Sequence, residues 1–406
     1  MSKGFRIAHL SDLHLGYRAT RKVDENGVNV REMDGYAAFQ ELVDSVLAHD
    51  VDVVIVAGDI FHTPTPSVRS ILFAQDQFRR LADAGVRVYM LAGNHDTKDV
   101  RSDIAASKLL DDRDRGIFSD VEPLAVHRIH DDITLHMISH HAYTEQGDTM
   151  NRIRTENGIN ILSTHGSVID PITSMRLKTE DSPREIVIPD TTLYDHGWDY
   201  VLLGHIHERG WIEPVSKGDA PGVFYNGSLI RRGFADKECP LGRGWTQWDI
   251  DSEGNFTSTI HTVHQRTQHD LDPIDASVLS SAEITERMVE QLRGTQSSLD
   301  APILRQRIVN ITPAKRNGID WKIVDHESSH ALDWKTVFES VSTTTEKKKR
   351  ASDTEHEANL LNAYDAWEKD SRALQDIDEH SRPVVAQNAK NLIQKELEEE
   401  LESEKV

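Results

Sequence analysis

Seven residues of the types that hold pairs of divalent metals recur in the first half of the chain, nearly all in short motifs that contain glycine. Carboxylate, imidazole and amide ligands, with no thiolate among them, suit Mn²⁺ or Fe²⁺ and argue against a cysteine-rich structural zinc site. Two such ions about 3.5 to 4 Å apart can hold the attacking and leaving oxygens of a phosphoryl displacement together. The predicted ligands are Asp12, His14, Asp59, Asn94, His165, His205 and His207.

Each motif follows a short apolar run, which indicates a buried β-strand. The runs are residues 5–10, 51–57, 86–91, 159–162 and 200–203. Open α/β sheets place their sites at the carboxyl ends of strands, so we expect the ligands to meet at one such edge. The neighbouring glycines are expected to free each strand to turn immediately at its ligand.

Each motif also has a simpler interpretation when it is taken alone. A single Asp or Asn after a strand is commonly a turn residue or a helix cap, and a single His is commonly a hydrogen-bonding core residue. Five strand-end motifs in one chain are hard to obtain from turn chemistry, and together they favour the metal site. Other histidines near the expected strands lack the glycine and are assigned to the core or the surface: His9, His136, His140 and His141.

Amphipathic helices are expected between the early strands. Apolar residues at helical spacing predict helices at 35–50 and 67–84, and a third helix is expected at 103–110. Alternation of strands and helices predicts a layered α/β domain over residues 1–268.

The second half of the chain changes character twice. A polar stretch at 265–273 predicts a domain boundary, and residues 275–345 are predicted to form a small α+β domain from a helix at 282–292 and a strand at 303–311. Residues 346–406 are predicted to be a linker followed by two amphipathic helices, the typical form of a helix-in-groove ligand. A solvated acidic tail is the alternative.

Composition limits the class of protein. The 406 residues allow two or three domains. There is no run of about 18 apolar residues and no charged-then-apolar amino terminus, so we expect neither a membrane span nor a signal peptide. The single cysteine, Cys239, cannot form an internal disulfide, which fits a reducing cytoplasm.

The net charge of −22 is the strongest argument against a nucleic-acid substrate, because phosphate binding is driven by Lys and Arg. An excess of 68 acidic over 46 basic residues is also typical of proteins from a high-salt cytoplasm, where charge repulsion is screened. Positive residues beside the motifs are candidates for a local DNA-binding rim, with ordinary solvated charges as the alternative. These candidates are Arg18, Arg21, Lys22, Arg231 and Arg232.

The motifs match the pattern D-x-H, G-D, G-N-H-D, a lone His and G-H-x-H of the calcineurin-like metallophosphoesterases, and no motif residue departs from it. More narrowly, the chain resembles the nuclease subunit of double-strand-break repair complexes, the Mre-eleven/SbcD type. The features that carry this narrower resemblance are D-L-H-L-G at 12–16, the extension of the second motif to His62, and Y-N-G-S at 225–228. The motifs cover roughly residues 5–230.

The resemblance implies two Mn²⁺ ions bridged by Asp59. It assigns one ion to Asp12, His14, Asp59 and His207, and the other to Asp59, Asn94, His165 and His205. It implies that His95 stabilises the phosphorane and protonates the leaving 3′ oxygen. It also implies that Asp96 orients this imidazole and that His62 turns the phosphate toward the metals. A plain loop residue is the alternative for His62.

The activity implied by the resemblance is 3′ to 5′ exonuclease cleavage of duplex DNA and endonuclease cleavage of single strands, in DNA double-strand-break repair. The implied partners are DNA, a coiled-coil ATPase of the Rad-fifty type bound by the carboxy-terminal helices, and a second copy of the chain. The helices after the second and third motifs would form that homodimer, unless they pack only on their own sheet. The small α+β domain would cap the active site, and the protein would be cytoplasmic and nucleoid-associated during repair.

Two other functions remain open from the sequence. The metal motifs also suit a phosphoesterase that acts on small molecules or phosphoproteins. A scaffold that binds DNA ends and cleaves little is the third possibility, although the complete ligand set weighs against it.

Overall fold

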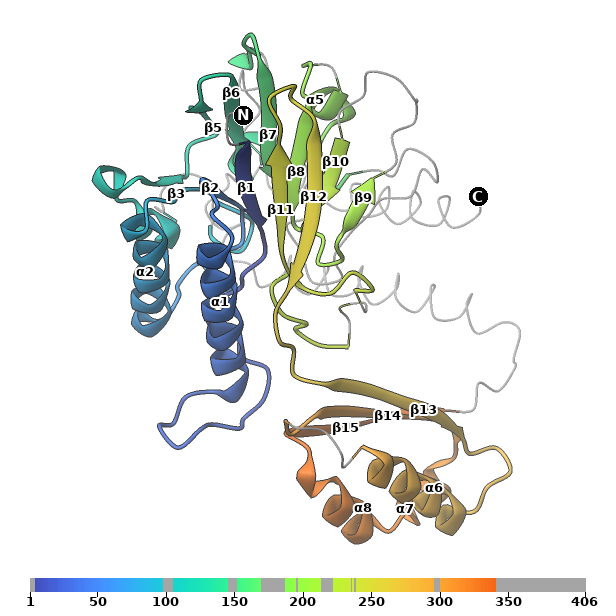
Figure 1. Ribbon diagram of the computed structural model, residues 1–406. Helices are drawn as coiled ribbons and strands as arrows, with labels where there is room; N and C mark the ends of the chain where they lie inside the picture. Colours follow the sequence, from blue (N-terminus) through green and yellow to red (C-terminus); the bar gives the residue numbers. More distant parts are fainter. Residues whose placement is uncertain are drawn as a thin grey trace, which may run out of the picture. The chain divides into compact units, whose positions relative to one another are not determined.

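The computed structural model describes residues 4–97, 105–144, 152–168, 187–194, 196–212, 222–234, 236, 239–295 and 300–340. The chain divides into two compact units, residues 1–339 and 340–406. The predicted helical tail at 346–406 lies outside the described residues. The described part of the first unit carries three β-sheets (Figure 1).

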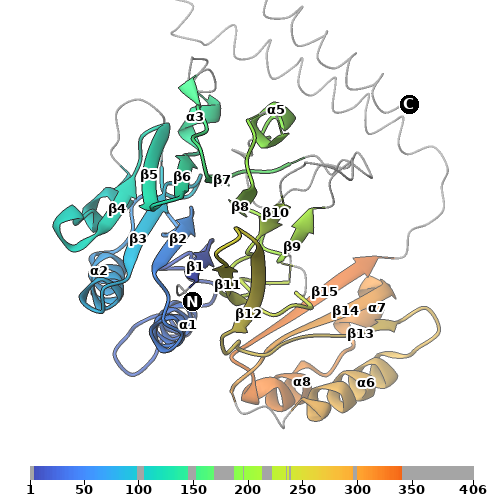
Figure 2. The ribbon, with the colours of Figure 1, turned by 45° about the horizontal axis from the view of Figure 1, so that its top comes forward.

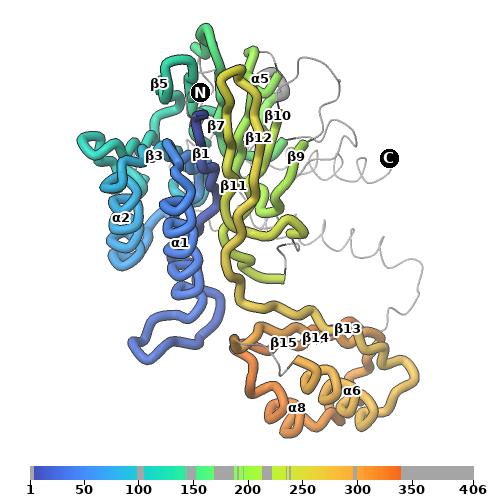
Figure 3. Tube along the Cα trace, in the orientation of Figure 1, coloured from blue at the N-terminus to red at the C-terminus, as the bar shows by residue number. Residues whose placement is uncertain are grey.

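The first sheet has the strand order β12-β11-β1-β2-β3-β4, and the tube in Figure 3 shows β1 beside β11. Strands β1 to β4 run parallel to one another, whereas β11 is antiparallel to β1 and β12. The bounds are β1 Phe5–Leu10, β2 Val53–Ala57, β3 Arg87–Leu91, β4 Ile117–Asp120, β11 Gly244–Ile250 and β12 Phe256–Thr262.

The second sheet has the order β5-β6-β7-β8-β10-β9, with β6, β7, β8 and β10 parallel. Its bounds are β5 Leu124–His130, β6 Ile133–Ile138, β7 Ile159–His165, β8 Tyr200–Gly204, β9 Gly210–Ile212 and β10 Gly222–Tyr225. The short helix α3, His141–Thr144, follows β6 along the chain. A second short helix, α5, Asp190–Tyr194, comes between β7 and β8.

Both faces of strands β1, β2 and β3 are buried, which explains the continuous apolar runs that predicted them. Along β1, Ile7 packs against the second sheet, while Ala8 and Leu10 pack against the helices on the other side. A third apolar cluster, which includes Leu203 and Trp198, covers the outer face of the second sheet. The result is the layered α/β sandwich that the sequence predicted.

Helices α1, Val30–Ala48, and α2, Val68–Asp83, lie side by side on the outer face of the first sheet (Figure 1). Asn29 caps α1 by accepting from the backbone N–H groups of Arg31 and Glu32, so α1 begins five residues before the predicted start. Ser67 caps α2, which matches its predicted span closely. Of the helix predicted at 103–110, the described part is a 3₁₀-helix, η1, at Ala106–Leu110, followed by a shorter one, η2, at Arg113–Arg115.

The third sheet, β13-β14-β15, belongs to the predicted α+β region and has its own apolar core (Figure 2). Its elements are β13 Gln268–Asp275, α6 Ser281–Gly294, β14 Ile303–Ile311, α7 Pro313–Asn317, α8 Trp321–Glu327, η3 Ser328–His330 and β15 Asp333–Ser340. The polar stretch expected to be a boundary instead begins a strand, because β13 pairs in parallel with β14 and buries Gln268 and Ile274. Just before β13, Arg266 donates two hydrogen bonds of 2.7 Å to Asp34 of α1. Among the described helices, none is both long and apolar enough to cross a bilayer.

Candidate metal centre

The seven predicted ligands are brought together in one buried cluster between the two large sheets. Strands β1, β2 and β3 supply the ligands up to Asn94, and strands β7 and β8 supply the three later histidines. Asp59 lies centrally, because its Oδ2 is 3.7 Å from His14 Nε2 and 3.4 Å from His165 Nε2. Three overlapping groups each place three possible ligand atoms within 4.8 Å of one another: Asp12, His14 and His207; Asp12, Asp59 and His165; and His14, His62 and His95.

The backbone is unusual where the ligands leave their strands. Six non-glycine residues in the described ranges have positive φ, and four of them are predicted ligands. The φ angles are 51° at Asp12, 44° at His14, 52° at Asp59 and 101° at His205. Such conformations are costly for L residues and concentrate at functional sites, where the surrounding fold maintains them.

The glycines beside the ligands serve two different purposes. Gly58 has φ 86° and provides the sharp turn that the sequence predicted. Gly93 and Gly204 instead allow close packing: a Cβ on Gly93 would lie 2.2 Å from Asp59 Oδ1, and one on Gly204 would lie 2.0 Å from the carbonyl oxygen of Ala57. The ligand motifs therefore interlock through atoms that no larger side chain would permit.

His165 shows how the fold sets the direction of a ligand. Its Nδ1 donates to the carbonyl oxygen of Ala57 at 2.8 Å, which turns Nε2 toward Asp59 and places it 2.9 Å from Asn94 Oδ1. The lone pair of a neutral ring would face these oxygen acceptors, so the position requires a proton or a cation. The donor set fits a metal ion there, and the fold thus presents a site suited to positive charge.

Electrostatics supports the same conclusion. Burial acts to lower the pKa of His165, but the carboxylates of Asp59 and Asp12 outweigh it and raise the pKa to about 9. Burial acts to raise the pKa of Asp59, yet the charges of His165 and His95 hold it well below its usual value. Burial lowers the pKa of His14 well below its usual value, so that ring is available as a neutral ligand.

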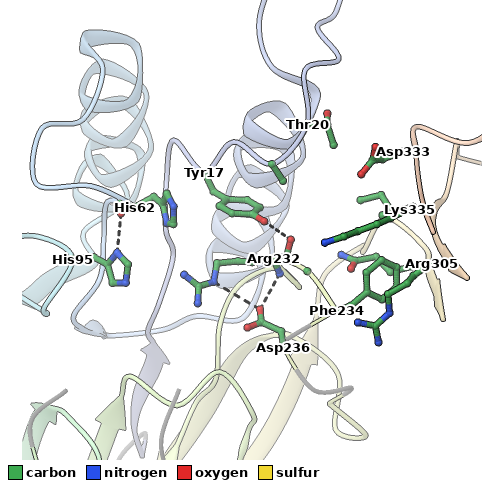
Figure 4. A pocket seen from close by; sticks show the side chains of 14 residues that line it. Tyr17, Thr20, His62, His95, Arg232, Phe234, Asp236, Arg305, Asp333 and Lys335 are labelled. Atoms are coloured by element: carbon green, nitrogen blue, oxygen red, sulfur yellow. Dashed lines mark hydrogen bonds and ion pairs between the residues drawn. The ribbon is translucent and has the colours of Figure 1, made fainter. Parts of the chain in front are cut away.

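The two predicted catalytic histidines lie at the edge of the cluster, where they line a cavity of about 830 Å³ (Figure 4). The His62 and His95 rings stack with centroids 5.4 Å apart, and the centroid of His14 is 4.8 Å from that of His95. Tyr17 packs edge-on against His62 at 5.0 Å. His62 is therefore part of the wall of the site rather than a solvent-facing loop residue.

Asp96 does not have the neighbours that the sequence predicted for it. His95 Nδ1 donates to the carbonyl oxygen of His62 at 2.8 Å, so this carbonyl orients the ring. The Asp96 carboxylate instead accepts the backbone N–H groups of Gly93, Phe61 and Ile60 at 2.9, 3.0 and 3.3 Å. Burial and the charge of Asp59 raise its pKa to about 7. Asp96 holds the second and third motif loops together, and the expected contact with the imidazole is absent from its hydrogen bonds.

The five candidate DNA-binding residues are in different environments. Arg21 and Lys22 are exposed, and Arg18 pairs with Glu32 at 2.7 Å. Arg231 bonds the carbonyl oxygens of Asp236 and Gln268. Arg232 is buried and lines the cavity, with its Nη2 3.1 Å from Nδ1 of His207 (Figure 4). The structure therefore places one candidate inside the site and leaves the others at or near the surface.

The wall of the cavity opposite the histidines comes from the small α+β region, through Arg305, Asp333 and Lys335 (Figure 4). Arg305 pairs with Asp270 and lies 4.5 Å above the ring of Phe234. The sequence showed no signal for these residues, because none of them lies in or near a motif.

The histidines set aside from the metal site occupy the core, as predicted. His9, His136 and His140 are buried, and His136 approaches Asn160 at 3.2 Å. The side chain of His141 lies outside the described residues.

A residue that the sequence did not reveal is Asp236, which contacts a predicted ligand. Its Oδ1 is 2.9 Å from His207 Nδ1, and its Oδ2 accepts the backbone N–H of Arg232 at 2.9 Å. An acidic residue well beyond the last motif carries no glycine or strand-end signal that would distinguish it from the other acidic residues of this chain.

Comparison with known proteins agrees with the geometry. The family model described as calcineurin-like phosphoesterase matches residues 5–209. A protein of Sulfurisphaera tokodaii named DNA double-strand break repair protein Mre11 is 27% identical over 210 residues, which are 50% of this chain and 49% of that protein. A protein of the same name from Methanococcus maripaludis is 23% identical over 312 residues, covering 75% of this chain and 78% of its own. The match thus spans about half the length of the first relative.

A solved dimetal phosphatase from Danio rerio covers 61% of this chain and 93% of its own, with 11% identity and a TM-score of 0.37. A likeness at this level carries no argument about substrate.

Proposed function

Because the chain belongs to the calcineurin-like phosphoesterase family, we propose that it is a Mn²⁺-dependent nuclease that acts on DNA in double-strand-break repair. The observation that carries the proposal is the convergence of seven candidate ligand residues beside two stacked histidines at the edge of a cavity. The similar proteins named for double-strand break repair favour DNA over other phosphoesters. The proposed activities are 3′ to 5′ exonuclease cleavage of duplexes and endonuclease cleavage of single strands.

The proposed metal ligands divide into two sets around Asp59, because Asp59 Oδ2 lies between His14 Nε2, at 3.7 Å, and His165 Nε2, at 3.4 Å. When bound, the two ions supply a nucleophilic hydroxide and neutralise the charge of the reacting phosphate. Mn²⁺ is proposed because the donor atoms are carboxylate and amide oxygens and imidazole nitrogens. The sets are Asp12, His14, Asp59 and His207, and Asp59, Asn94, His165 and His205.

The chain's own histidines perform the remaining chemistry in this proposal. His95 is held by the carbonyl of His62 through Nδ1–H. In the imidazolium form, Nε2 carries a second proton, which it would give to the departing 3′ oxygen as the ring returns to the neutral form. His62 presents its ring from the same wall and positions the phosphate. Asp96 maintains the loops that carry both residues.

Three cations in the cavity support a polyanionic substrate in spite of the net charge of −22. Arg232 lies beside the predicted ligands, while Arg305 and Lys335 line the opposite wall (Figure 4). A strand crossing this cavity would meet positive charge on both sides of the reacting phosphate.

The test is cleavage of end-labelled duplex and single-stranded DNA by the purified chain at high salt, with Mn²⁺ or with EDTA. The expected result is shortening of duplexes from their 3′ ends with Mn²⁺ alone and no cleavage by His95→Ala purified in parallel. Hydrolysis of a small phosphodiester without any cleavage of DNA would favour the alternative function, a phosphoesterase for small substrates. Binding of DNA ends without either hydrolysis would favour a scaffold.

A homodimer is proposed from the surface of α2 and η1. Phe78 and Leu81 of α2 are buried, but Val68 and Leu72 on the same helix are 71% and 60% exposed, and Leu109 of η1 is 60% exposed. Gln75 of α2 donates to the carbonyl oxygen of Leu109, which places the two elements together. Light scattering should show that Leu72→Glu lowers the mass to that of one chain, whereas the exposed Arg79→Glu on the same helix should not; an unchanged mass for both would refute the interface.

The partner proposed for residues 346–406 is a coiled-coil ATPase of the Rad-fifty type, on the basis of two helical stripes of apolar residues in an acidic segment. Deleting residues 351–406 should abolish ATPase binding in a pull-down and leave Mn²⁺-dependent cleavage intact. Undiminished binding by the shortened chain would refute the assignment.

A further inference from the structure

Asp236 is a carboxylate outside the proposed ligand set that contacts a proposed metal ligand, and nothing in the motifs assigns it a role. It is buried, with 9% of its surface exposed, and it lies beside Arg232 in the cavity wall (Figure 4). Its two oxygens are used separately: Oδ1 faces His207 Nδ1 at 2.9 Å, and Oδ2 accepts the backbone N–H of Arg232 at 2.9 Å.

The first contact determines which nitrogen of His207 is free. Nδ1 of His207 has two neighbours, Asp236 Oδ1 at 2.9 Å and Arg232 Nη2 at 3.1 Å. A carboxylate oxygen only accepts hydrogen bonds, so the shorter contact places the proton of a neutral ring on Nδ1 and leaves the lone pair on Nε2. That Nε2 points into the ligand cluster, 3.1 Å from His14 Nε2 and 3.8 Å from Asp12 Oδ1. Hydrogen bonds from a ligand imidazole to a carboxylate orient the ring and increase its basicity toward a metal.

The second contact keeps the carboxylate in place. Arg232 supplies its backbone N–H to Oδ2, and its guanidinium Nε lies 3.8 Å from the same oxygen. These contacts hold the Asp236 carboxylate in place beside His207.

We infer that Asp236 is a positioning residue for His207, and that it sets the affinity of the metal ion that His207 binds. The inference rests on the proposed dinuclear site and adds to it a residue that touches neither metal nor substrate. It also explains why the segment after Arg232 returns to the site: its acidic residue completes the orientation of a ligand that lies 29 positions earlier in the chain.

The test measures Mn²⁺ binding by isothermal titration, without any reference to cleavage. Asp236→Ala is expected to lose about 10- to 100-fold in affinity for one of the two ions. Asp236→Asn retains an oxygen acceptor but not the charge, so a smaller loss, about tenfold, is expected. Asp333→Asn is the matched control, because its carboxylate lines the same cavity from β15 without any recorded contact to a ligand, and it should bind both ions as the parent does.

Parent-like affinity for both ions in Asp236→Ala would overturn the inference. If Asp236→Ala does not fold, Asp236→Asn carries the test, and parent-like affinity there would overturn it equally. Failure of the parent chain to bind two ions would instead contradict the proposed function, so the two failures are distinguishable.

Discussion

His95 donates from Nδ1 to the backbone carbonyl oxygen of His62 across 2.8 Å, and the two rings stack with centroids 5.4 Å apart. The orientation of His95 therefore depends on the main chain of the loop that follows Asp59. Because this anchor is a carbonyl group, the side chains of the two histidines can be changed independently.

Replacing His95 by Ala should lower DNA cleavage by about 10²- to 10⁴-fold, the usual contribution of general acid catalysis. The ring is outside the proposed ligand set, so both Mn²⁺ ions and DNA binding should be retained. Cleavage assays paired with metal analysis would check this. Loss of metal from the variant would show that His95 is structural.

Replacing His62 by Ala removes a ring but keeps the carbonyl group that holds His95. If the ring positions the phosphate, kcat should fall by about 10²-fold, because small displacements of a reacting group are costly. Steady-state kinetics on a short duplex would measure the effect. Full activity would show that His62 contributes only its main chain.

Replacing Gly93 by Ala should eject at least one metal ion. The added Cβ would lie 2.2 Å from Oδ1 of Asp59 and 2.5 Å from its backbone nitrogen, so the central ligand must move. Gly233→Ala is the matched control, since a Cβ there meets nothing within 4 Å. Metal analysis after gel filtration would compare them, and two retained ions in Gly93→Ala would contradict the close packing described for this motif.

His9 should make folding stability depend on pH. Burial, with a further contribution from the charge of Arg209, lowers its pKa from 6.5 to about 3. Between these values the unfolded chain binds a proton that the folded chain does not, so this stability is present above pH 6.5 and is lost as the pH falls toward 3. The loss reaches about 1.4 kcal/mol per pH unit.

His9→Leu removes this titration from the core. The difference in free energy of unfolding between His9→Leu and the parent should therefore shift in favour of the variant as the pH is lowered from 7 to 5. Urea unfolding at each pH would measure the difference. Parallel curves for the two proteins would show that His9 is not buried in its neutral form.

Sequence patterns located the strands that end in the proposed ligand motifs, because a strand buried on both faces must be apolar throughout. Strands β1 and β14 have the bounds that were expected, and β2, β3, β7 and β8 differ only at their ends. The polar residues 265–273, predicted to be a boundary, include the start of β13, a largely exposed strand of the separate small sheet. An α-helix was expected at 103–110, but residues Ala106–Leu110 form a 3₁₀-helix.

The role of each site residue was harder to predict than which residues lie in the site. Asp96 follows His95 directly, but neighbours in a tight turn point in different directions, and Asp96 turns toward the backbone of another motif. Arg232 was expected at a rim and lies beside His207 instead.

The sequence by itself determined the residue types, the order and the strand-end places of the proposed ligands, because these depend on local chemistry and on the period of each strand. Only the tertiary structure decided that two separate sheets supply the ligands, that Gly93 is required for packing against Asp59, and that Asp236 meets His207. These contacts join residues far apart in the chain, and the packing of one sheet on another, rather than any local preference, brings them within bonding distance.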